Sequence, residues 1–144
     1  PYPELYCVII HPHLQVETKG ARGILSPTVA LKKYVEQSAQ LAATVCALYT
    51  KDIELLRRAM QDLIIEPQRA ALVTGYYAVK QAALDAGAIS ATFSGSGPSL
   101  LAFCANQAQA EVVAQAMLAA FQEHDIAADH WISPINPHGA YLIA

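Results

Sequence analysis

The sequence predicts an α+β fold with two layers, in which an antiparallel sheet of about four strands carries helices on one face. Two observations lead to this prediction. Short apolar runs typical of strands alternate with longer stretches of helical periodicity, and their order along the chain is strand, helices, strand, strand, helix, strand. This is the split β-α-β-β-α-β order of the ferredoxin-like fold, with extra helices in the first crossover.

The first strand is predicted at residues 5–10, a continuous apolar run that ends at His11 and Pro12. Such a run is typical of a central strand that is buried on both faces. Ser26 and Pro27 then predict a helix start, with a hydroxyl N-cap followed by proline at the first helical position. The apolar residues of this helix recur at helical spacing and are expected to face the core. They are Leu31, Val35, Leu41, Val45 and Leu48.

Two further helices are predicted in the same crossover. Thr50 is expected to cap the second helix, and Pro67 breaks its pattern. The third helix is expected to run from about Gln68 until Gly87 ends it in the left-handed conformation. The predicted inward positions are Ile53, Leu56, Met60 and Leu63 in the second helix, and Leu72, Tyr76, Val79 and Ala83 in the third.

The second half of the chain returns to strand patterns. Residues 89–93 alternate apolar and polar side chains, and residues 100–104 form the next apolar run. Asn106 is expected to cap a fourth helix, with Gln109 completing a capping box. The expected core positions of that helix are Val112, Val113, Ala116, Met117, Ala120 and Phe121.

A last strand is predicted at residues 129–135. Asn136, Pro137, His138 and Gly139 then form a turn, and residues 140–143 close the sheet.

Composition indicates one cytoplasmic domain. The 144 residues are 54% hydrophobic and only 15% charged, so part of the surface is expected to face a partner or a missing segment. A net charge of −3 without a basic run argues against nucleic acid, and no apolar stretch is long enough to predict a membrane span. The odd number of cysteines indicates reduced thiols. Because the chain begins Pro1-Tyr2-Pro3, we expect a fragment or a processed chain.

The loop Ser94-Gly95-Ser96-Gly97-Pro98-Ser99 is the main candidate site. Glycines allow close approach of another group, and amides crowded into one turn can form a concave nest for an anion. The alternative is a tight connection between two strands. The loop has neither the order of a P-loop nor that of a dinucleotide site.

Arginines supply the other candidates. Arg22 lies in a polar segment with Thr18 and can clamp a carboxylate or phosphate, or it can be a solvated side chain. Arg69, in the stretch Glu66-Pro67-Gln68-Arg69, can reach the same anion while Glu66 steadies it, or the two can form an exposed pair. His11 and His13 lack the further ligands that a metal site needs, so no metal site is predicted. No catalytic side chain is predicted either.

Three of these stretches together resemble the C-terminal half of homoserine kinases, a family of the galactokinase, homoserine kinase, mevalonate kinase and phosphomevalonate kinase superfamily. The glycine loop is similar to the third, C-terminal glycine motif of the superfamily. Thr18, Ala21 and Arg22 match a Thr-x-x-Ala-Arg stretch, and Glu66 to Arg69 match Glu-Pro-x-Arg. The resemblance covers essentially the whole chain.

This resemblance implies transfer of a phosphoryl group from ATP, with Mg²⁺, to the hydroxyl of L-homoserine in threonine biosynthesis. It implies that Thr18, Arg22, Arg69 and Gly97 bind the substrate. It also implies that Ser94, Gly95, Ser96 and Gly97 lie near the phosphates, and that the full-length enzyme is a homodimer.

The family's ATP-binding motif, Pro-x-x-x-Gly-Leu-Gly-Ser-Ser, belongs to the N-terminal half and does not occur in this sequence. We therefore expect residues 1–144 to be the C-terminal substrate-side domain, to bind no ATP or Mg²⁺ alone, and to be inactive alone. Two alternatives stay open. The chain can be an amino-acid-binding regulatory module, or a domain of another small-molecule kinase of the superfamily.

Overall fold

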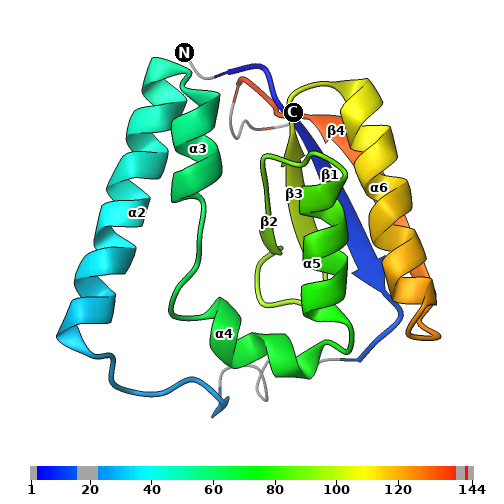
Figure 1. The fold of residues 1–144 in the computed structure, drawn as a ribbon, viewed down its shortest axis with the longest axis horizontal. Coiled ribbons are helices and arrows are strands. Elements are labelled where there is room, and N and C mark those ends of the chain that lie inside the picture. Colours follow the sequence, from blue (N-terminus) through cyan, green and yellow to red (C-terminus); the bar gives the residue numbers. More distant parts are fainter. Residues whose placement is uncertain (1–2, 16–22, 139–141, 143–144) are drawn as a thin grey trace.

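The computed structural model describes residues 3–15, 23–138 and 142. The described elements confirm the predicted α+β fold, with a four-stranded antiparallel sheet and several helices in the first crossover (Figure 1). In chain order they are β1 (Tyr6–Pro12), α2 (Leu31–Thr50), α3 (Ile53–Ala59), α4 (Glu66–Arg69), η1 (Ala70–Leu72), α5 (Tyr76–Asp85), β2 (Ser90–Phe93), β3 (Leu100–Cys104), α6 (Gln107–Gln122) and β4 (Ala128–Pro134). Of the closing strand expected at residues 140–143, only Leu142 is described.

The sheet has the order β2-β3-β1-β4, and each neighbouring pair is antiparallel. Helices α5 and α6 lie over one face (Figure 1), and the core forms there from apolar side chains of the strands and of both helices. Strand β1 is central, as predicted. The prediction that β1 is buried on both faces is wrong. Val8 and Ile10 are fully buried under the helices, whereas Cys7 and Ile9 on the other face are partly exposed.

Helix α2 differs most from expectation. It begins at Leu31 rather than at Pro27, because the Ser26 hydroxyl closes a local turn, donating to the Thr28 carbonyl (2.7 Å) and accepting from the Thr28 amide (3.3 Å). Of the apolar positions predicted to face the core, Leu31, Val35, Leu41 and Val45 face solvent instead. Leu48 is partly buried against the second core cluster, and Ala47 is the buried residue of the helix.

The next helices are shorter than predicted. Asp52, not Thr50, caps α3 by accepting from the Leu55 amide (2.8 Å), and α3 ends at Ala59. The expected third helix is divided in two, because Gly75 adopts a positive φ of 79° between η1 and α5. Pro67 lies within the first turn of α4, where proline fits, rather than breaking a helix.

Signals at the other helix ends are confirmed. Gly87 (φ 96°) ends α5, and its amide donates to the Leu84 carbonyl. Asn106 caps α6 by accepting from the Gln109 amide (2.9 Å), while the Gln109 side chain accepts from the Ala105 amide (3.0 Å). Val112 was wrongly assigned to the core of α6, since its side chain faces solvent.

Candidate functional site

The glycine loop joins β2 to β3 and is closed by its own backbone. The Ser94 amide donates to the Ser99 carbonyl (2.8 Å), and the Gly97 amide donates to the Ser94 carbonyl (3.3 Å). Gly95 and Gly97 have positive φ values of 63° and 82°, and the Gly97–Pro98 bond is cis. Because two of its amides are used inside the loop, the loop can offer only part of a cradle to an anion.

Helix α4 brings Arg69 to this loop. The Arg69 Nη1 donates to the Gly95 carbonyl oxygen at 3.5 Å, and the arginine is half-buried. Two motifs 26 residues apart in sequence therefore meet at one end of the sheet. A guanidinium held beside a turn of amides suits a carboxylate or a phosphate.

A buried carboxylate fixes the turn that carries Arg69. Glu66 is only 4% exposed, and its Oε1 lies 2.5 Å from the Lys80 Nζ in a salt bridge between α4 and α5. Its Oε2 accepts from the Thr92 hydroxyl of β2 at 3.0 Å. Glu66 thereby connects α4, α5 and the strand that leads into the glycine loop, which is a larger role than steadying one arginine.

Two stacked aromatic rings lie at the start of the glycine loop. Phe93, the last residue of β2, stacks on Tyr76 with ring centroids 4.2 Å apart. Among the described residues, the Tyr76 hydroxyl is a buried oxygen without a hydrogen-bond partner. Burial, and next the negative charge of Glu66, raise the pKa of Tyr76 far above its usual range, so this residue stays neutral and acts by packing.

Sequence reasoning missed one contact of the loop. His11 Nδ1 lies 2.8 Å from the Ser99 hydroxyl, so the end of β1 is joined to the end of the glycine loop. In the sequence, His11 suggests only the question of a metal site. The antiparallel register of β1 with β3 places both residues at the same end of the sheet. No local pattern in the sequence indicates that register.

Thr18 and Arg22 lie outside the described residues, so their predicted roles stay predictions. In the described ranges, no three acidic, histidine or cysteine side chains cluster as a metal site would need, and no helix is long and apolar enough to cross a membrane.

The three cysteines are free thiols. Burial, followed by the nearby Cys7, raises the pKa of the Cys104 thiol to about 11, so Cys104 is protonated and unreactive at neutral pH.

The two loop glycines make a testable pair. Both have positive φ, so alanine at either position costs about 1–2 kcal/mol in backbone strain. A Cβ at Gly97 would also lie 3.1 Å from the Phe93 ring, whereas a Cβ at Gly95 meets nothing within 4 Å. We therefore expect Gly97→Ala to lower the free energy of unfolding by about 1 kcal/mol more than Gly95→Ala. Urea unfolding of both variants measures this difference, and equal losses would contradict the packing argument.

Comparison with known proteins adds to this geometry. Residues 44–123 match the protein family described as GHMP kinases C terminal. The chain is 43% identical to the homoserine kinase of Chloroherpeton thalassium over 142 residues, 98% of this chain and 44% of that protein. It is also 43% identical to the homoserine kinase of Chlorobium phaeobacteroides strain BS1 over 146 residues, 99% of this chain and 46% of that protein. The chain thus spans less than half the length of these curated relatives.

Two solved structures of kinases superpose on this chain. A homoserine kinase from Cytophaga hutchinsonii superposes with a TM-score of 0.94 and 44% identity, covering 96% of this chain and 44% of that one. A mevalonate kinase of L. major in complex with R-mevalonate superposes with a TM-score of 0.75 over 96% of this chain and 44% of its own, at 17% identity. The second likeness concerns the fold alone.

Proposed function

Because this chain belongs to the family of GHMP kinase C-terminal domains, we propose that it is the C-terminal, substrate-side half of a homoserine kinase. The intact enzyme would transfer the γ-phosphate of ATP to the hydroxyl of L-homoserine, in the cytoplasm and in threonine biosynthesis, as a homodimer. The identity of 43–44% to homoserine kinases, against 17% to the mevalonate kinase, supports homoserine over another alcohol.

The observation that carries this proposal is the meeting of Arg69 with the glycine loop. Homoserine presents a carboxylate at a fixed distance from its reacting hydroxyl. Arg69, together with Arg22 and Thr18, would hold that carboxylate through charge-assisted hydrogen bonds, with Gly97 allowing close approach of the substrate. Because the molecule is short, holding its carboxylate also orients its hydroxyl. Such positioning supplies much of the catalysis in phosphoryl transfer.

Ser94, Gly95, Ser96 and Gly97 would line the cleft near the phosphates of ATP. Since the amides of Ser94 and Gly97 are used within the loop, the rest of a phosphate cradle must come from another part of the enzyme. Mg²⁺ would neutralise phosphate charge in the intact enzyme. The described residues offer no cluster of ligands for that metal, so we assign no magnesium site to them.

The direct test is a phosphorylation assay of the intact protein with a panel of alcohols. We expect phosphorylation of L-homoserine and at least a hundredfold lower kcat/KM for mevalonate. A preference for mevalonate would assign the chain to another kinase of the superfamily. Binding of an amino acid without phosphorylation would favour a regulatory module.

A second expectation concerns the 144-residue chain by itself. With only part of a phosphate cradle, it should bind Mg-ATP negligibly and transfer no phosphate. Calorimetric titration with Mg-ATP should show no heat beyond dilution, and the intact protein serves as the positive control. Binding at micromolar concentrations would mean that the nucleotide site lies within this chain.

A further inference from the structure

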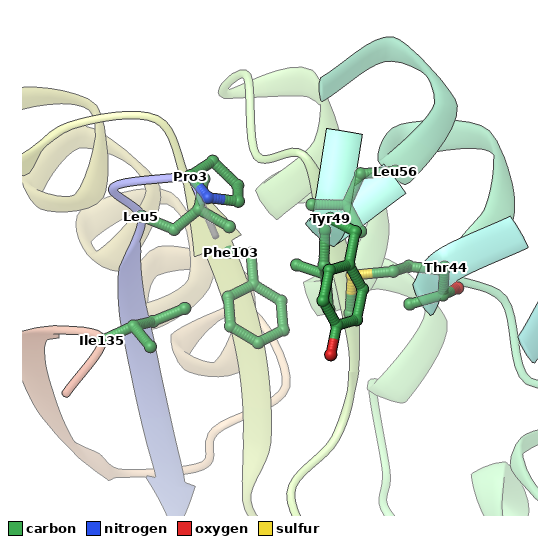
Figure 2. A pocket seen from close by; sticks show the side chains of 9 residues that line it. Pro3, Leu5, Thr44, Tyr49, Leu56, Phe103 and Ile135 are labelled. Atoms are coloured by element: carbon green, nitrogen blue, oxygen red, sulfur yellow. The ribbon is translucent and has the colours of Figure 1, made fainter. Parts of the chain in front are cut away.

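The face of the sheet away from α5 and α6, called the open face here, is apolar along most of its length. Alternation along β1 and β3 places five partly exposed side chains on it: Cys7, Ile9, His11, Leu101 and Phe103. Figure 2 shows Phe103 at one end of this face, on the strand side of an apolar pocket whose opposite wall includes Tyr49 and Leu56. At the other end, beside the glycine loop, the apolar row is replaced by the polar side chain of His11.

His11 and Ser99 form a pair across two strands. The paired residues of β1 and β3 end with Ile10 and Leu100, and His11 and Ser99 are the next residues beyond them. Their side chains meet, with the His11 Nδ1 2.8 Å from the Ser99 hydroxyl oxygen. Either group can donate, so this hydrogen bond forms with either neutral tautomer of the imidazole. A cross-strand pair at this position fixes the point at which the glycine loop enters β3.

Ser99 also closes the glycine loop through its backbone. Its carbonyl accepts from the Ser94 amide at 2.8 Å, so the residue that His11 holds is the one that holds the start of the loop. Arg69 contacts the loop as well, at the Gly95 carbonyl, but its distance of 3.5 Å makes that hydrogen bond the weaker of the two. His11 is therefore the stronger side-chain contact of the loop.

We propose that His11 is a positioning residue for the phosphates of ATP. It acts through Ser99, by holding the end of the glycine loop, rather than by contact with the reacting atoms. Because Gly95 and Gly97 have positive φ values and no side chains, the loop has little stiffness of its own, and an anchor keeps its remaining amides in one place. The inference rests on the proposed function for the presence of phosphates beside residues 94–97.

The effect of His11 should be larger for the nucleotide than for homoserine. Beyond β1 the chain has contacts of its own, since the His13 amide donates to the Ala127 carbonyl (2.8 Å) and the His13 ring bonds to Asp129 (2.9 Å). These contacts do not involve the His11 ring, and neither does the contact of Arg69 with the loop. Loss of the His11 bond therefore loosens the loop and leaves the arginine in place.

The test is calorimetric titration of the intact protein with Mg-ATP. His11→Ala and Ser99→Ala should each raise the Kd about fivefold, the factor that one neutral hydrogen bond supplies. His13→Ala breaks the exposed pair with Asp129 and is the matched control, with a Kd expected to stay within about twofold of the parent. A role in folding alone would reduce the number of binding sites per chain and leave the Kd unchanged, and that result would overturn the inference.

Two further variants test the hydrogen bond itself. The double variant of His11→Ala with Ser99→Ala should raise the Kd no more than either single change, because the same bond is lost in all three. His11→Asn should restore the Kd to within about twofold of the parent, since the asparagine amide lies where the imidazole Nδ1 does. Effects that multiply to about 25-fold in the double variant, or a failure of asparagine to rescue, would overturn the inference.

Amide exchange separates failure of this inference from failure of the proposed function. In the intact protein without nucleotide, the Ser94 amide should exchange about threefold faster or more in His11→Ala, and at the parent rate in His13→Ala. Equal exchange in all three proteins would overturn the inference, whichever alcohol is phosphorylated. Phosphorylation of mevalonate in place of homoserine would overturn the proposed function and leave this inference standing, because neither measurement contains the alcohol.

Discussion

Replacing Arg69 by alanine in a full-length kinase that contains this chain should raise the KM for homoserine about ten- to a hundredfold. A charge-assisted hydrogen bond is worth about 1.5–3 kcal/mol, and about 1.4 kcal/mol corresponds to a factor of ten. The KM for ATP should change little. If Arg69 also orients the reacting hydroxyl, kcat should fall as well. Steady-state kinetics with each substrate varied in turn measures these effects.

The control for Arg69 is Arg58→Ala, which removes an exposed arginine from α3, away from the glycine loop. Arg22→Ala should act like Arg69→Ala if both hold the carboxylate. Lysine at position 69 should rescue only in part, because it restores the charge without the planar fork. Homoserine KM values within twofold of the parent for both alanine variants would remove the main support for the substrate assignment.

The second large effect is expected at the buried pair. Lys80→Met leaves the Glu66 carboxylate buried with the Thr92 hydroxyl as its remaining partner among the contacts described above. Breaking a buried ion pair costs about 3–5 kcal/mol. Because the Lys80 side chain keeps 22% exposure, we expect a loss near the lower end, about 3 kcal/mol. Urea unfolding of the 144-residue chain measures it.

Two comparisons make the interpretation of Lys80→Met specific. Glu66→Gln combined with Lys80→Met removes the unpaired charge and should recover at least half of the lost stability. Glu54→Gln breaks the exposed pair with Arg57 (3.8 Å) and should cost less than about 1 kcal/mol. If Lys80→Met costs no more than Glu54→Gln, then Glu66 is not held by charge pairing.

The Lys80→Met variant also tests whether the buried ion pair holds Arg69 in position. Glu66 fixes the turn that carries Arg69, so Lys80→Met should also raise the homoserine KM in the intact enzyme. The double variant, which leaves no unpaired charge in the turn, should lower that KM again. A KM that stays unchanged while stability falls would show that the position of Arg69 does not depend on this network.

Local patterns in the sequence were sufficient for the strands and for several helix ends. The apolar run of β3, the capping box of Asn106 with Gln109 and the left-handed Gly87 each depend on residues that are close in sequence. Their physical causes act over a single turn or strand, so the sequence alone determines them. The order of these elements was also enough to predict the antiparallel sheet, because split crossovers allow few arrangements.

Only the tertiary structure decided which apolar faces are buried and which side chains meet. Periodicity places Leu31 and Leu41 on one side of α2 but does not say whether a partner lies there, and in this chain none does among the described residues. Ser26 had the chemistry of an N-cap, yet its hydroxyl closed a turn with Thr28 instead. The contacts of Glu66 with Lys80 and of His11 with Ser99 join residues that are 14 and 88 positions apart. Such pairings depend on how the helices and strands pack, and no local pattern encodes that packing.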